Sequence, residues 1–165
     1  MRNKQFVAQH QGGLLSKTQQ QQLMQWSCDC AEHVLPLFGD NIDERLTHAL
    51  AVGRAWQQSQ MPTGAAMKAS VAAHAAARAA TQPTAIAVAR AIGHAVATAH
   101  MADHALGGAI YALKAVKYAG QSIEAERQWQ NERLPAALKA MVMVARQEKE
   151  QAFKDLSSNN TLAKF

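Results

Sequence analysis

Three histidines and an aspartate, His94, His100, Asp103 and His104, lie within eleven consecutive residues of a stretch that is otherwise rich in alanine. On a helix, His100 and His104 would share one face, because positions four apart differ in direction by about 40°. Imidazole pairs at this spacing occur in metal sites, and Asp103 could orient one ring or serve as a third ligand. His94 could join them only if the helix broke in between. One interpretation is therefore a small metal- or ligand-binding protein that uses His94, His100, Asp103 and His104, the metal ligands being His100, His104 and Asp103.

A structural role for these histidines is the interpretation that we favour. The chain has neither a His-Glu-x-x-His motif nor a Glu-x-x-His pair, which would mark metal-binding helices. Buried polar groups need partners, and an imidazole bonded to an arginine, a carboxylate or a carbonyl would fix which helix faces which. We predict a core polar network of His74, Arg78, Arg90, His94, His100, Asp103 and His104.

The sequence offers no convincing catalytic group. Cys28 is five residues from His33, and a Gly-x-Ser-x-Gly motif is missing, so an activated nucleophile is not evident. Gly107-Gly108 lies inside a helical pattern, where close approach of two backbones is its expected role. We therefore predict that the chain is not an enzyme and needs no cofactor.

Five of the twelve carboxylates fall in one short segment that holds no lysine or arginine before Arg45. Two explanations remain open. Carboxylates at a helix N-terminus interact favourably with the helix dipole, by about 0.3 to 1 kcal/mol each. Alternatively, they form an acidic recognition face. The residues are Asp29, Glu32, Asp40, Asp43 and Glu44.

The charge pattern argues against a nucleic-acid partner. Seventeen lysines and arginines against twelve carboxylates give a net charge of +5. The basic residues are spread along the chain, whereas a dedicated nucleic-acid binder concentrates them in a stripe with aromatic residues between them. No apolar run approaches 20 residues and no signal peptide opens the chain, so we expect a cytoplasmic protein with no membrane partner.

The composition predicts an all-α fold. Alanine makes up about a fifth of the chain and strand-type runs are almost absent, as expected for helices rather than sheets. Apolar spacing with cap and proline signals predicts seven helical segments. The first covers about 17–35, and the second runs from caps at 40–43 to about 59. The others cover about 63–80, 83–99, 103–118 and 122–133, and a last one begins at 135. A break in the helix near Met101 is favoured over one continuous helix through 83–118. The chain would then have seven helices with the break and six without it. Their centre should be an alanine-rich helical hairpin.

The domain organisation is simple. Residues 1–15 are polar with a Gly12-Gly13 pair, which predicts a flexible arm. Residues 16–153 should form a single helical domain, and 154–165 a frayed tail. The alanine rows of the hairpin would let helix backbones approach to about 8 to 10 Å. We therefore expect tight packing that tolerates no larger side chain at Ala91 or Ala95.

Several segments resemble the immunity-protein-five-like family of bacterial immunity proteins, associated with polymorphic toxin systems. The most specific segment runs from Gly93-His94 to Asp103-His104-Ala-Leu-Gly107. The others are residues 30–38, 54–56, 72–80, 111–115, 126–130 and 134–135.

The resemblance implies an all-helical cytoplasmic protein that binds and neutralises a cognate protein toxin without catalysis. It carries no assigned active site to this chain. For a basic toxin, the acidic segment is the binding face that we predict, because complementary charge accelerates encounter. A helical homo-oligomer is the remaining alternative, since alanine-rich faces and tryptophan edges can form a symmetric interface.

Overall fold

The computed structural model describes residues 2–153 and 156. Within them the chain forms seven α-helices and no strand longer than a single bridge, so the all-α prediction is confirmed. The helices are α1 (Lys17–Val34), α2 (Glu44–Gln57), α3 (Thr63–Ala79), α4 (Pro83–Ala97), α5 (His104–Tyr118), α6 (Ile123–Glu132) and α7 (Ala136–Glu150). Short 3-10 helices are η1 (Lys4–Phe6), η2 (Gln9–Gln11) and η3 (Leu35–Phe38). None of the described helices is long and apolar enough to cross a membrane.

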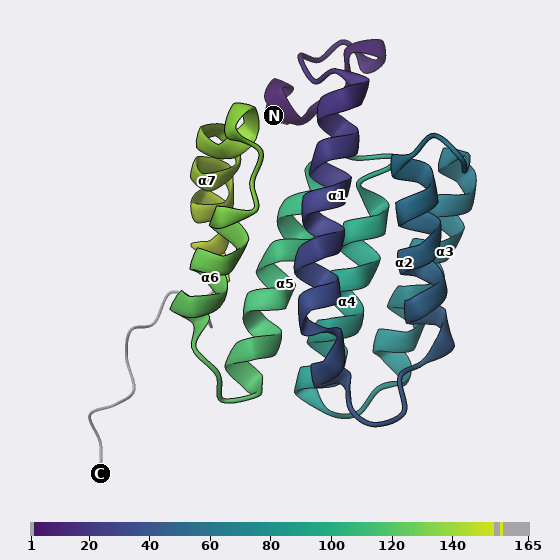
Figure 1. The fold of residues 1–165 in the computed structure, drawn as a ribbon, viewed down its shortest axis with the longest axis vertical. Helices are drawn as coiled ribbons and strands as arrows, with labels where there is room; N and C mark the ends of the chain where they lie inside the picture. Colours follow the sequence, from purple (N-terminus) through teal and green to yellow (C-terminus); the bar gives the residue numbers. More distant parts are fainter. Residues whose placement is uncertain (1, 154–155, 157–165) are drawn as a thin grey trace.

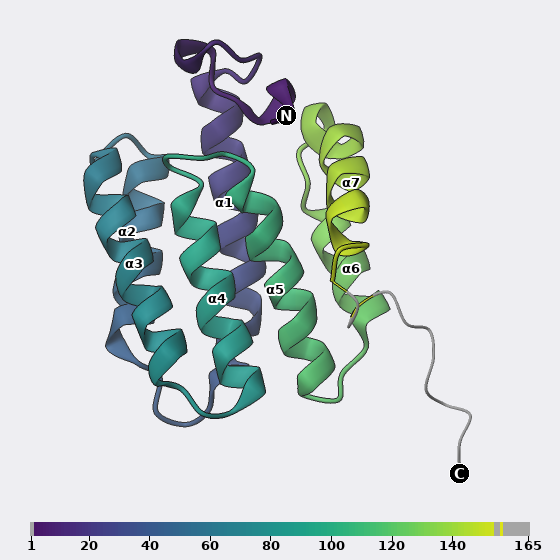
Figure 2. The same cartoon turned by 180° about the vertical axis from the view of Figure 1, so that it is seen from behind.

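The alanine-rich hairpin of α4 and α5 lies at the centre of the bundle, as predicted. Helix α1 crosses one face of the hairpin, with α2 and α3 on one side and α6 and α7 on the other (Figure 1). From behind, α3, α4 and α5 lie side by side as one layer (Figure 2). Ten of the fifteen residues are buried in α4 and again in α5, and most are alanine or glycine. Small side chains at these contacts let the helices approach closely.

The helix ends follow local signals in the sequence. Each predicted end from the first to the sixth helix lies within two residues of the observed one. Helix α1 starts with a capping box, in which Ser16 and Gln19 bond to each other's backbone N–H. Pro62 occupies the N-cap position of α3, so Thr63 is the first residue of the helix and does not cap it. The Thr63 hydroxyl instead accepts a hydrogen bond from Nε1 of Trp56 at 3.0 Å.

The chain breaks between α4 and α5, which confirms the predicted break. Gln20 of α1 stabilises the break, because its side-chain amide donates to the carbonyls of Thr98 (2.9 Å) and Ala99 (3.1 Å). Asp103 does not cap α5 through its side chain. Asp103 stands at the N-cap position, but its backbone is helical and its carboxylate accepts no hydrogen bond from the first turn. Capping residues usually have an extended backbone.

The first fifteen residues contain more structure than a polar composition suggests. The side chains of Phe6 and Leu15 are each only 2 % exposed, and Ala8 forms a bridge with Leu15. Phe6 and Leu15 belong to the hydrophobic core. The flexibility of residues 1–15 remains a prediction. The predicted frayed tail at 154–165 lies outside the described residues except for Leu156.

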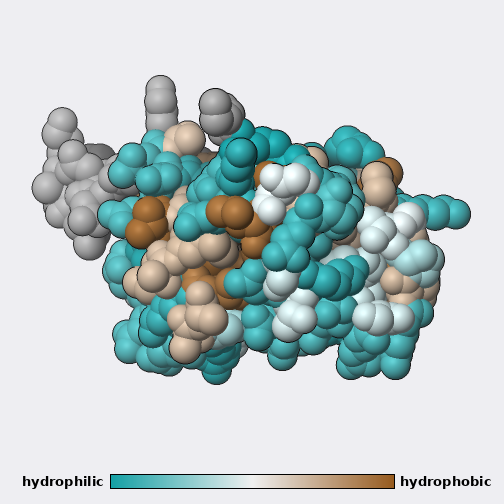
Figure 3. Space-filling model, turned by 90° about the horizontal axis from the view of Figure 1, so that it is seen from above, coloured by the Kyte–Doolittle hydropathy of each residue, from teal (hydrophilic) through white to brown (hydrophobic). Residues whose placement is uncertain are grey.

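The surface carries a few scattered apolar side chains. Seen from above, the most hydrophobic residues gather mainly on the side of α7 and the N-terminal segment, and the side of α2 and α3 is mostly of intermediate hydropathy (Figure 3). Leu14, Val71 and Val144 are the most exposed of the described large apolar residues. Since single exposed apolar residues are normal, they do not define a site.

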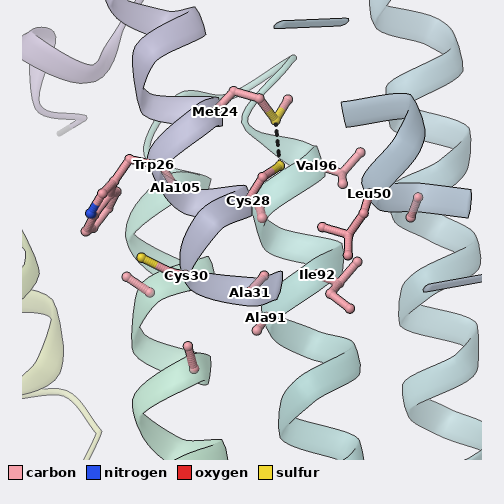
Figure 4. Packing of buried hydrophobic residues seen from close by; sticks show 14 of the residues in the cluster. Met24, Trp26, Cys28, Cys30, Ala31, Leu50, Ala91, Ile92, Val96 and Ala105 are labelled. Carbon is pink, nitrogen blue, oxygen red and sulfur yellow. Dashed lines mark hydrogen bonds between the residues drawn. The ribbon is translucent and has the colours of Figure 1, made fainter. Parts of the chain in front are cut away.

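The core between α1, α2 and α4 contains two sulfur side chains. The Cys28 thiol donates to the sulfur of Met24 at 3.6 Å, and both lie beside Leu50 and Val96 (Figure 4). Both cysteines of the chain are buried and unpaired in the described structure. Burial raises the pKa of Cys28 to about 12, so the thiol is not a ready nucleophile.

The hairpin of α6 and α7 is attached through buried polar groups. Trp26 of α1 donates from Nε1 to the carbonyl of Gln130 at 2.9 Å. The Gln130 side chain is fully buried, donates to the carbonyl of Ala109 at 3.1 Å and accepts from Arg146 at 3.0 Å. One glutamine therefore links α5, α6 and α7.

Candidate functional site

The histidines form a row across three helices. His74 of α3, His94 of α4 and His104 of α5 lie with ring centroids 5.0 and 5.3 Å apart. His100, in the turn before α5, continues the row at 5.3 Å from His104. Tyr111 stacks on His94 at 5.1 Å. We call His74, His94, His104 and His100 the histidine row. The break between α4 and α5 brings His94 to His104, which the sequence allowed only for a broken helix.

Two glycines make room for two of the rings. A Cβ atom at Gly93 of α4 would lie 2.6 to 2.8 Å from three atoms of the His74 ring. A Cβ atom at Gly107 of α5 would lie 2.9 Å from atoms of the His94 ring. Each ring of this pair therefore rests against the bare backbone of the next helix in the layer. Any larger residue at either glycine would push the ring or the helix away.

The ring nitrogens make two short contacts. Nη1 of Arg90 lies 2.8 Å from Nδ1 of His74. Because arginine can only donate, this nitrogen of His74 must accept and carry no proton. Nδ1 of His94 lies 3.1 Å from Nδ1 of His104, so a hydrogen bond requires the proton on only one of the two. The geometry of the row fits neutral imidazoles.

The electrostatic environment favours the same state. Burial, reinforced by nearby cations and imidazoles, lowers the pKa of His94 to about 3 and that of His74 to about 4. Burial also lowers the pKa of His104, although the Asp103 carboxylate acts in the opposite direction. At neutral pH these three rings are uncharged.

The other members of the predicted network take different positions. Arg78 is exposed on α3 and makes no hydrogen bond or ion pair to the row. Nδ1 of His100 and Oδ1 of Asp103 are buried without a hydrogen-bond partner among the described residues, although Arg2 lies 3.8 Å from Asp103. Sequence reasoning missed Tyr111. The only sign in the sequence was its position, an aromatic residue three after Gly108.

The metal hypothesis gains no support from this geometry. In residues 2–153 and 156, no group of three or more histidine, cysteine, aspartate or glutamate side chains could hold a metal ion. The side chains of His100, Asp103 and His104 are neighbours, but they do not point at one common position where a metal ion could bind.

The acidic segment divides into two parts. Asp29 and Glu32, on α1, both contact Nη2 of Arg54 on α2, at 2.7 and 3.0 Å. This arginine offsets much of their charge. The pair therefore links two helices, in addition to facing solvent.

The second part is the loop between η3 and α2. Asp43 caps α2 through the backbone N–H of Arg45 and also pairs with the Arg45 guanidinium at 2.7 Å. Arg45 lowers the pKa of Asp43 mainly through this side-chain hydrogen bond. Asp40 and Glu44 are exposed on either side, with Ile42 between them also exposed. The helix-dipole explanation fits Asp43 and Glu44, and Asp40 and Glu44 are the carboxylates of the segment most open to a partner.

A cavity of about 270 Å³ lies beside the first part, lined by Asp29, Glu32, His33, Trp129 and Arg133. His33 stacks flat on Trp129 at 3.7 Å and binds buried Glu126 through Nδ1 at 2.8 Å. The Arg133 guanidinium also covers the Trp129 ring at 3.6 Å.

The sequence alone did not indicate that Trp129 and Glu126 belong to one site. The structure places Trp129, half-buried, in the lining of this cavity and Glu126 among the buried residues. Burial raises the pKa of Glu126, against the effect of His33. Helical periodicity showed which face each residue occupies, but not that α6 lies against the end of α1.

Comparison with known proteins identifies one family. The family described as Imm-5 like putative immunity protein matches residues 13–137. This range includes α1 to α6, the whole histidine row and all five carboxylates of the acidic segment. No curated protein and no solved structure matches the chain.

Proposed function

The chain belongs to the Imm-5 like putative immunity protein family, and from this premise we propose that it binds a cognate bacterial toxin and neutralises it without catalysis of its own. Family membership is the observation that carries the proposal. Both thiols are buried with raised pKa values, so neither is an activated nucleophile.

The acidic segment is the proposed binding face. It holds five of the twelve carboxylates in a chain whose net charge is +5, so its charge is opposite to that of the protein as a whole. Such a local patch steers a basic partner and raises its association rate. A basic toxin, such as a nuclease, has the matching chemistry.

The loop between η3 and α2 is suited to this role because it is fixed at both ends. The half-buried Leu37 and Phe38 of η3 pack against the hydrophobic core, and Asp43 caps α2. A preordered loop loses little conformational freedom on binding. Asp40, Ile42 and Glu44 would then present two carboxylates around one apolar contact.

The test is the association rate with the toxin encoded beside this protein, measured at low salt. The Asp40→Asn, Glu44→Gln variant keeps the cap at Asp43, so the fold should persist. We expect association to slow by about threefold to tenfold. The matched control is Glu132→Gln, Glu148→Gln, which removes two exposed carboxylates from α6 and α7.

Two outcomes separate the parts of this proposal. An unchanged association rate in the Asp40, Glu44 variant would reject the binding face and leave the function standing. Failure of the unmodified protein both to bind the toxin and to protect cells that express it would reject the function itself.

A further inference from the structure

We propose that the histidine row is a proton-sensitive seam: neutral imidazoles hold α3, α4 and α5 together, and mild acid destabilises the layer because the rings can take up protons only where the helices separate. The proposal is independent of the toxin and of the acidic segment. It rests on the ring contacts, on the two glycines and on the charges around the row.

The contact of His74 with Arg90 has no place for an additional proton, and the facing nitrogens of His94 and His104 have place for only one proton between them. A proton on Nδ1 of His74 would point at the guanidinium of Arg90, which can only donate. Protonating both His94 and His104 would place two N–H groups against each other across 3.1 Å. Either event turns an attractive contact into a repulsive one.

Two of the rings also have no room to move toward the next helix of the layer. His74 lies against the backbone of Gly93, and His94 against that of Gly107, at distances that leave no space for a Cβ atom. Close packing transmits such a displacement to the helices instead of absorbing it locally. A protonated ring is therefore expected to separate the helix that carries it from its neighbour.

Most of the charges that face the row are cations and oppose protonation, whereas the Asp103 carboxylate favours it. Asp103 is the one carboxylate in the set, so a new positive charge finds mostly cations. The set consists of Arg2 from the N-terminal segment, Arg78 on α3, Arg90 on α4, His100 and Asp103 in the turn, Tyr111 and Lys114 on α5, and Lys149 on α7.

The sign of the effect follows from linkage. Folding lowers the pKa of His74 and His94 from the ordinary 6.5 to about 4 and about 3. Below pH 6.5 the unfolded chain therefore binds more protons than the folded one, and stability falls as the pH falls. Above pH 6.5 both states are neutral and the effect vanishes.

The first experiment is urea unfolding of the full chain between pH 7.5 and 4.5. Each histidine that stays neutral raises the unfolding equilibrium constant by up to about tenfold per pH unit below 6.5. In His74→Gln, whose amide oxygen can still accept from Arg90, this dependence should be clearly weaker. His48→Gln is the matched control, because His48 is exposed on α2, and should behave as wild type. Equal pH dependence in all three proteins would overturn the proposal.

A second measurement needs no variant and decides the matter if His74→Gln fails to fold. Proton NMR of the wild-type protein follows the ring signals of its seven histidines over the same pH range. We expect at least two rings to keep neutral shifts until the folded signals disappear. Titration of all seven near pH 6.5, with the folded spectrum intact, would refute the seam.

Discussion

The contact between His74 and Gly93 can be tested by a double-mutant cycle. Gly93→Ala adds a Cβ atom 2.6 to 2.8 Å from the imidazole, and overpacking of this kind costs about 1 to 3 kcal/mol. Alanine in a helix interior regains about 0.5 to 1 kcal/mol relative to glycine. We therefore expect Gly93→Ala to lower the free energy of unfolding by about 1 to 2 kcal/mol. In a His74→Ala background the ring is gone, and the same change should be neutral or stabilising.

The assay is urea unfolding of the four proteins at about pH 7.5, where the imidazoles are neutral in both states. The expected coupling is at least about 1 kcal/mol, above the few tenths seen for independent sites. Gly64→Ala is the control, because Gly64 lies in a helix, α3, but no atom would come within 4 Å of the added Cβ. Its stability should be unchanged or slightly raised.

Additivity would refute this reasoning. If Gly93→Ala destabilises the protein equally with and without the His74 ring, the ring moves aside freely. The glycine would then serve only the approach of the two helix backbones.

Three further predictions concern the core. Ala91→Leu fills a fully buried position and should cost about 1 to 3 kcal/mol, with an unchanged melting temperature counting against tight packing. Gln130→Leu removes one of the acceptors of buried Arg146 and should lower the free energy of unfolding in urea by about 1 to 3 kcal/mol. The thiols of Cys28 and Cys30 should resist a thiol-reactive dye until the protein is denatured, because burial raises both pKa values; rapid labelling of the native protein would contradict this.

Local chemistry explains why the helices could be predicted. Pro62, Pro83 and Pro135 each stand at the start of a helix, where a missing N–H costs little. Ser16 and Ser122 act as caps through their hydroxyl groups. These signals operate over three or four residues, so they can be read without knowledge of the fold.

The candidate site depends on contacts that the sequence does not display. His94 reaches His104 because Gln20, some eighty residues earlier, holds the end of α4 open through two carbonyls. His33 meets Trp129 only because α6 packs beside α1. Periodicity identifies the face that a residue occupies, but it carries no information on the partner of that face.

Each glycine and the imidazole that lies against it depend on each other, although they are distant in the sequence. A ring on α3 requires a bare backbone on α4, and a ring on α4 requires one on α5. A change at either member is tolerated best when the other changes with it, as for any tightly packed pair. Within the family, positions 74 and 93 should therefore vary together, as should 94 and 107, and one pair can drift without the other.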